Sequence, residues 1–192
     1  MKHKIYAYYE AIQSLPQDEE FSCANYWKQS WEKNGWECVM LNKSHAVASA
    51  VHQKLMQKLV KLSFALPMEL QSKFPMIVAR FSRWSALHAA GGGWMSDYDV
   101  FNYSLTPDIA NQSAKTLNLI AGEPCHLFYA TREHCAAAIT KFINEELVEG
   151  SSLRFESDIL NLTENLNHFS DKIHHAKKGD KPKSEVMAAL LQ

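Results

Sequence analysis

Short apolar runs alternate with amphipathic stretches along the first part of the chain. Residues 5–9 (Ile-Tyr-Ala-Tyr-Tyr) and 36–41 (Trp-Glu-Cys-Val-Met-Leu) are short and mostly apolar, which predicts two strands. Between them, residues 18–34 carry large apolar side chains at helical spacing, and Asn34-Gly35 is a typical helix end. A strand, a helix and a second strand in this order predict a βαβ unit with parallel strands and a right-handed crossover.

Two longer helices are expected next. Over residues 45–62 the apolar positions recur every three to four residues, which predicts one amphipathic helix that ends before Pro67. The residues expected on its apolar face are Val47, Val51, Leu55, Leu59 and Leu62. A second helix is predicted from about residue 75 to residue 90, because Pro75 suits a first helical turn and the glycines 91–93 follow its end.

The second half of the chain predicts three further strands and one helix. A very short strand at 94–95 leads into the acidic segment, and two more strands are expected over 117–121 and 126–130. A helix is expected over 132–148. Its expected inward side chains are Ala137, Ile139, Phe142, Ile143 and Leu147.

These elements predict an α/β fold. Strands that alternate with helices are typical of a sheet covered by helices. We expect one domain over residues 1–175, followed by a flexible C-terminal tail over residues 176–192, where a charged stretch contains Gly and Pro.

Composition narrows the classes of protein. The chain has 192 residues, of which 46% are hydrophobic and 21% charged, so it can form a true core. A formal net charge of -1 argues against a nucleic-acid binder with a broad cationic face. Four cysteines without C-x-x-C spacing, no secretory leader and no apolar run of about 20 residues predict a reduced, cytoplasmic protein without a transmembrane segment.

The candidate chemistry lies in Asp97-Tyr98-Asp99. Two carboxylates separated by one residue at the end of a strand point the same way, because side chains alternate with period two. Both then reach one hard divalent cation, Mn²⁺ or Mg²⁺, whose remaining ligands come from water and phosphate oxygens. An acidic pair in an ordinary surface turn is the alternative.

Residues before the acidic pair suit an anionic ligand. Gly92 and Gly93 allow close approach of the backbone, since they lack a Cβ. Arg80 and Arg83, on the preceding helix, are candidate donors of bidentate hydrogen bonds to phosphate or sugar hydroxyls.

The segment from Arg80 to Phe101 resembles the DXD-containing glycosyltransferases of the GT-A fold, in the sugar-binding region shared by initiating mannosyltransferases, large-toxin glucosyltransferases and capsular polysaccharide transferases. The matching residues are Arg83-Trp84, Leu87, Gly91-Gly92-Gly93-Trp94 and Asp97-Tyr98-Asp99. The stretch between Arg83 and Asp97 is one residue longer than the family pattern, and Arg80 stands where the toxin-like members carry an aspartate. The resemblance implies a single GT-A-like, Rossmann-like domain with a mixed, mostly parallel central sheet flanked by helices.

The resemblance also implies how a nucleotide-diphosphate sugar is bound. Asp97 and Asp99 would hold the metal together with the diphosphate and ribose of the donor, and Tyr8 or Tyr9 would face the base. The expected donor-binding residues are Tyr8, Tyr9, Arg80, Arg83, Gly92, Gly93, Asp97 and Tyr98.

Two C-terminal positions complete the expected site. In GT-A enzymes a third metal ligand, often a histidine, commonly comes from this part of the chain, and His168 is preferred here over His174 and His175. A surface histidine is the alternative for His168. Asp158 is a candidate base for the acceptor hydroxyl or a group that orients the sugar, and a helix N-cap is its alternative role.

The predicted function is that of a metal-dependent glycosyltransferase, of hexosyltransferase type, that moves a sugar from a nucleotide-diphosphate donor to a glycan, lipid or protein acceptor. One alternative is a catalytically silent nucleotide-sugar or glycan-binding module. A less favoured alternative is an aspartate-nucleophile phosphatase, whose Asp-x-Asp normally follows the first strand and is followed by Thr or Val where Phe101 stands here.

Overall fold

A computed structural model describes residues 3–11, 17–66, 68–108, 118–120, 127–144, 164–165 and 173–175. The helices are α1 (Gln17–Lys33), α2 (Lys43–Val47), α3 (His52–Ala65), α4 (Met68–Gln71), α5 (Phe74–Ala89) and α6 (Arg132–Asn144). The strands are β1 (Lys4–Tyr8), β2 (Glu37–Leu41), β3 (Gly92–Ser96), β4 (Val100–Asn102), β5 (Asn118–Ile120), β6 (Leu127–Thr131), β7 (Glu164–Asn165) and β8 (Ile173–His175).

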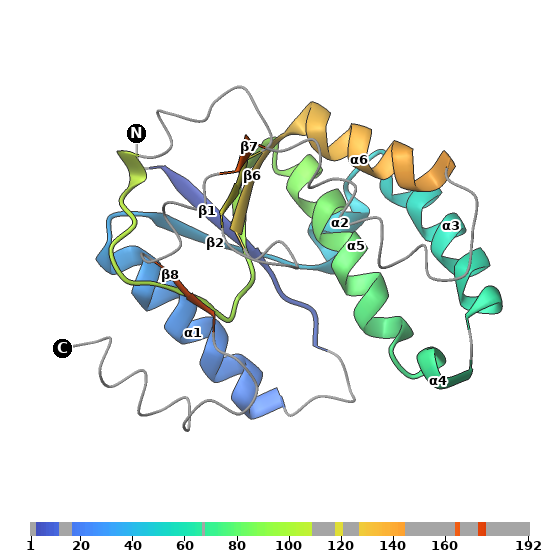
Figure 1. Cartoon of the computed structure of the whole chain (residues 1–192), viewed down its shortest axis with the longest axis horizontal. Helices are drawn as coiled ribbons and strands as arrows, with labels where there is room; N and C mark the ends of the chain where they lie inside the picture. Colours follow the sequence, from blue (N-terminus) through green and yellow to red (C-terminus); the bar gives the residue numbers. More distant parts are fainter. Residues whose placement is uncertain are drawn as a thin grey trace.

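A mixed sheet forms the centre of the molecule (Figure 1). Its strand order is β2-β1-β3-β6-β5-β7; β1 is parallel to both of its neighbours, and β6 is antiparallel to both of its own. Strands β4 and β8 form a separate antiparallel pair. The predicted βαβ unit and the predicted α/β fold, with a mixed, mostly parallel sheet and flanking helices, are confirmed.

Helices cover both faces of the sheet, and β1 is buried on both. Ile5 and Ala7 belong to the core cluster that includes the tryptophans of α1. Tyr6 and Tyr8 belong to a second cluster, which α2, α3, α5 and α6 complete on the opposite face. Successive side chains of a strand point to opposite faces, so this alternation is expected of a strand between two helical layers.

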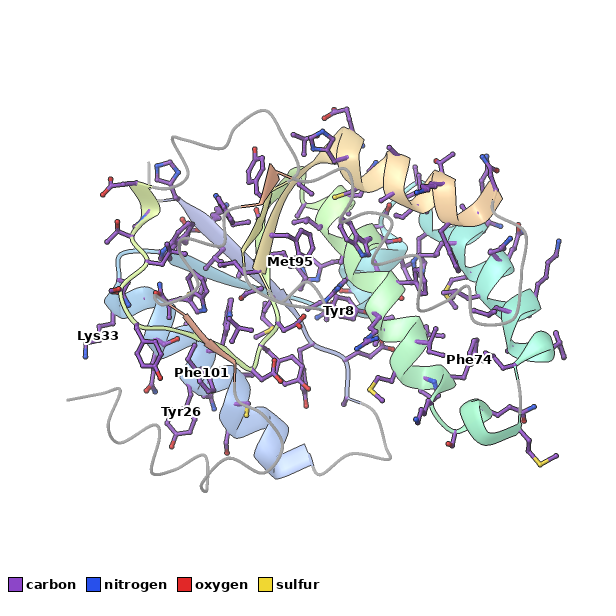
Figure 2. The ribbon with its side chains drawn as sticks, viewed as in Figure 1. Tyr8, Tyr26, Lys33, Phe74, Met95 and Phe101 are labelled. Carbon is purple, nitrogen blue, oxygen red and sulfur yellow. The ribbon has the colours of Figure 1, made fainter. Side chains whose placement is uncertain are left out.

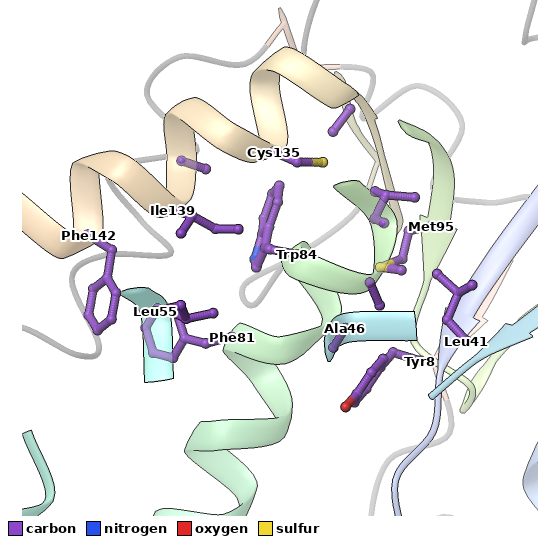
Figure 3. Close-up of a cluster of buried hydrophobic side chains, with 14 of the residues drawn as sticks. Tyr8, Leu41, Ala46, Leu55, Phe81, Trp84, Met95, Cys135, Ile139 and Phe142 are labelled. Carbon is purple, nitrogen blue, oxygen red and sulfur yellow. The ribbon is translucent and has the colours of Figure 1, made fainter. Parts of the chain in front are cut away.

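The larger cluster is built around aromatic side chains of α5. Trp84 points toward α6 in Figure 3 and stacks on Phe128 of β6, with ring centroids 4.6 Å apart. Phe81, one turn earlier, stacks on Phe142 of α6 at 4.1 Å. These contacts fix α5 against both β6 and α6, and α5 carries the arginine of the site described below.

The single helix predicted over 45–62 is wrong, because the chain forms α2 and α3 with a break between them. The Asn42 side chain accepts hydrogen bonds from backbone N–H groups of the first turn, so α2 begins earlier than expected. Within the break, the Ser49 hydroxyl bonds to His88 Nδ1 at 2.9 Å and accepts from the Val51 N–H. A serine side chain that accepts a hydrogen bond from a nearby backbone N–H competes with the hydrogen bonds of a helix. Val47 is consequently 60% exposed rather than buried.

The other predicted elements differ from the structure mainly at their ends. The predicted strand at 94–95 begins earlier, at Gly92, because the glycines join the ladder with β6. In α6, Ile139 and Phe142 are buried as predicted, whereas Ala137 is exposed and Cys135 is buried in its place. The predicted tail over 176–192 lies outside the described residues. Within the part of the chain that the structure describes, no helix is long and apolar enough to cross a membrane.

Candidate functional site

The carboxyl ends of three parallel strands lie together at one edge of the sheet. From β1 the chain passes to β2 on one side and later to β3 on the other side, so the strand order changes direction between β1 and β3. In open α/β sheets, ligands bind beyond the carboxyl ends of the strands at this kind of switch point. Residues 9–10 follow β1 and residues 97–99 follow β3 at this edge, which we call the carboxyl edge.

Asp97, Tyr98 and Asp99 form a turn between β3 and β4, in which the N–H of Val100 donates to the Asp97 carbonyl at 3.1 Å. We call residues 97–99 the acidic turn. The expectation that the alternation of a strand aligns the two carboxylates is wrong, because β3 ends at Ser96. Both aspartates are half-buried at the carboxyl edge, and the turn rather than the pleat of a strand determines where their side chains point.

Arg83 of α5 holds one side of the acidic turn. Its Nη1 donates to Asp97 Oδ1 at 2.7 Å, a short charge-assisted hydrogen bond. The Arg83 side chain is buried, and its guanidinium lies over the Phe128 ring at 5.6 Å from the centroid. The residue that was predicted to hold the donor therefore positions Asp97 in this structure.

Indole N–H groups hold the backbone on either side of the acidic turn. Trp27 of α1 donates to the Ser96 hydroxyl at 2.7 Å, and Trp31 donates to the Val100 carbonyl at 3.0 Å. Both tryptophans are buried. The sequence shows large apolar side chains at helical spacing here, but it carries no signal that these indoles bond to the backbone beside the acidic turn.

Of the two tyrosines at the end of β1, Tyr9 lies against the acidic turn. The rings of Tyr9 and Tyr98 meet edge to face, with centroids 5.6 Å apart. Tyr8 is buried, and its hydroxyl donates to Glu10 Oε2 at 2.7 Å. Burial, followed by the adjacent Glu10 carboxylate, raises the Tyr8 pKa well above its ordinary value, so Tyr8 remains protonated. The ammonium group of Lys43, the first residue of α2, lies 3.8 Å from the Glu10 carboxylate.

Gly92 and Gly93 lie at the start of β3, about 13 to 17 Å of extended chain away from Asp97. A Cβ on Gly92, whose φ is +87°, would lie 2.7 Å from the Ala130 carbonyl oxygen of β6. A Cβ on Gly93 would lie 2.8 Å from the Tyr6 ring. The structure therefore gives both glycines a packing role within the sheet and does not bring them to the acidic turn.

Arg80 is exposed and lies one helical turn before Arg83, which is about 4.5 Å along the axis of α5. Asp158 and His168 lie outside the described residues. The backbone of β8 does reach the site, because His175 pairs with Val100, the residue after the acidic turn, and His174 pairs with Phe101.

The acidic turn can supply only some of the ligands that a divalent cation needs. Among the described residues, no three His, Cys, Asp or Glu side chains lie close enough together to hold a metal ion. Two carboxylates alone suit Mg²⁺ or Mn²⁺, because such ions keep water and substrate phosphates among their ligands. Comparisons of the chain with protein-family models, with curated proteins and with solved structures find no match.

Proposed function

We propose that the chain is a metal-dependent glycosyltransferase of GT-A type, which transfers a sugar from a nucleotide-diphosphate donor to an acceptor hydroxyl. The position of the acidic turn carries this proposal: Asp97 and Asp99 follow β3 at the switch point of an α/β sheet. This is the place where phosphate-containing ligands bind such sheets. Two half-buried carboxylates at this place suit Mn²⁺ or Mg²⁺ and, through the cation, a diphosphate.

The neighbouring residues have complementary roles in donor binding. The Arg83 guanidinium fixes Asp97, so the carboxylate is oriented before the donor arrives. The Tyr9 and Tyr98 rings provide an aromatic surface beside the acidic turn for the base or ribose. Arg80, exposed and one turn from Arg83, is a candidate donor to a phosphate oxygen. A bound cation would stabilise the charge that develops on the leaving diphosphate.

The pairing of β8 with β4 supports His174 and His175 as candidates for a further metal ligand. Residues directly opposite each other in an antiparallel pair have Cα atoms about 4.5 to 5.5 Å apart. Val100 follows Asp99 directly, so the backbone of this histidine pair lies next to the acidic turn. His168, the ligand preferred from sequence, lies outside the described residues and stays a prediction, as does Asp158 as the catalytic base.

A thermal-shift panel of nucleotide-diphosphate sugars tests the proposal, each compound being measured with Mn²⁺ and with EDTA. A donor at 100 times its Kd stabilises the folded state by about 2.7 kcal/mol. For a chain of this size, this corresponds to a rise in Tm of roughly 5 to 10 °C. Asp99→Asn should abolish the rise, whereas Asp108→Asn, at an exposed position beyond β4, should preserve it.

Turnover separates the proposal from its alternatives. Sugar transfer or donor hydrolysis, measured as release of the nucleotide diphosphate, supports an enzyme. Metal-dependent binding without turnover would indicate a silent nucleotide-sugar-binding module. Release of phosphate from simple phosphomonoesters would indicate a phosphatase, although the acidic turn follows β3 rather than the first strand.

A further inference from the structure

Exposed apolar side chains gather at one end of the molecule. Six large hydrophobic side chains are exposed among the described residues, and four of them, Val60, Phe64, Met68 and Met76, lie within 17 consecutive positions. Phe64 and Met68 are 85% and 83% exposed. We call residues 60–76, the end of α3, α4 and the start of α5, the helical tip; Figure 1 shows these elements meeting at one extremity, where Phe74 marks the start of α5 in Figure 2.

The part of the chain that contains the helical tip has an excess of basic residues. Residues 43–96 contain seven lysines and arginines and one acidic residue, Glu69, which gives a net charge of +6; two of these cations, Lys43 and Arg83, are paired with Glu10 and Asp97. The rest of the chain carries a net charge of -7, so the overall value of -1 conceals this asymmetry. The exposed cations of the basic part include Lys54, Lys61, Lys73 and Arg80.

Helical spacing puts these cations beside the exposed apolar side chains. Lys54 and Lys61 are seven residues apart on α3, so they lie on one side of the helix two turns apart, and Phe64 follows Lys61 by three residues. On α5, Met76 lies four residues before Arg80. Helices α3 and α5 therefore each present exposed apolar and cationic groups together, whereas α4 contributes the exposed Met68 and no cation.

We infer that the helical tip docks on the surface of an anionic lipid bilayer. Exposed phenylalanine and methionine side chains enter the boundary between headgroups and acyl chains, while lysine and arginine contact anionic headgroups. A second copy of the chain fits less well, because it would bring Lys61 and Lys73 of one tip beside the same cations of the other. A lipid surface of opposite charge complements both the apolar and the basic groups.

The orientation of α5 determines where a docked bilayer would lie relative to the candidate site. Helix α5 and strand β3 run in opposite directions, joined through the glycines that follow α5. Phe74, at the start of α5, is nine residues or about 13 Å beyond Arg83, which contacts the acidic turn. The docked bilayer therefore lies beyond the carboxyl edge. The docking itself does not depend on the proposed enzymatic activity.

Vesicle flotation of the full chain tests this inference. We expect binding to phosphatidylcholine vesicles that contain 30% phosphatidylserine, little binding to pure phosphatidylcholine, and loss of binding at high salt. Lys54→Gln/Lys61→Gln should weaken binding about 25-fold, since each cation near the surface contributes about fivefold. Phe64→Ser should weaken it about tenfold. The control Lys4→Gln/Lys28→Gln, which removes exposed lysines elsewhere, should change it less than twofold.

Circular dichroism and Tm of each variant show whether the fold is retained, and Phe64→Ser is expected to retain it because the side chain is exposed. Equal binding to neutral and anionic vesicles, absence of binding to both, or normal binding by a folded Phe64→Ser variant would each overturn the inference. Light scattering provides the remaining outcome: a dimer that Phe64→Ser converts to a monomer, without vesicle binding, would identify the tip as a contact between copies and also overturn it.

Discussion

The contact between Arg83 and Asp97 leads to a quantitative prediction about the acidic turn. Arg83→Met keeps a long side chain in the buried space but removes the guanidinium. Hydrogen bonds to charged groups contribute about 1.5 to 3 kcal/mol, and the contact with the Phe128 ring adds about 0.5 kcal/mol. The Asp97 side chain is 27% exposed, which allows water to replace part of the lost contact. We therefore expect the free energy of unfolding to fall by about 2 kcal/mol.

Urea denaturation followed by tryptophan fluorescence measures this loss, and a double-mutant cycle with Asp97→Asn isolates the pair. The coupling free energy is expected to be about 1 kcal/mol or more, whereas independent sites add within about 0.5 kcal/mol. Arg80→Met, which removes an exposed arginine from the same helix, should change stability by less than about 0.5 kcal/mol. Additive effects in the cycle would refute the view that Arg83 positions the acidic turn.

Three further predictions concern packing and pH. Gly92→Ala should lower stability by about 3 kcal/mol in denaturant titrations, because its Cβ meets the backbone of β6; Gly91→Ala has a similar φ but no atom within 4 Å, and should lose only about 1 kcal/mol. Trp31→Phe should lose about 2 kcal/mol, since it deletes an indole bond to a buried carbonyl; an unchanged urea midpoint would count against this. Burial lowers the pKa of His52 and His88, so stability should be full above about pH 7.5 and fall as the pH drops through 6.5, where the unfolded chain takes up protons; His52→Gln/His88→Gln should show a smaller fall between pH 7.5 and 5.5.

Periodicity predicted much of the first half of the fold because its signals are local. The apolar run at the start of the chain and the helix end at Asn34-Gly35 specify β1, α1 and β2 without reference to the rest of the chain. The break between α2 and α3 has a different origin. It depends on a buried contact between Ser49 and His88, 39 residues away, which periodicity does not encode. The apolar repeat over residues 45–62 therefore predicts one continuous helix, although tertiary contacts break the chain into α2 and α3.

The candidate site was predicted in its composition but not in its geometry. The acidic pair and the arginine were identified as a group, and the structure joins Arg83 to Asp97. The glycines were expected near the ligand, yet their position is determined by strand pairing with β6 and by the ring of Tyr6. The bonds from Trp27 and Trp31 to the backbone beside the acidic turn span 69 residues each, so no local pattern predicts them.

The most direct test of the central claim is calorimetric titration of the chain with the best nucleotide-diphosphate sugar from the thermal-shift panel. We predict binding in the presence of Mn²⁺, its loss in EDTA, and its loss in Asp99→Asn while the urea midpoint of that variant stays close to that of the parent chain. Binding that is equally tight in EDTA, or that survives unchanged in the folded Asp99→Asn variant, would contradict the assignment of the acidic turn as a metal-dependent donor site.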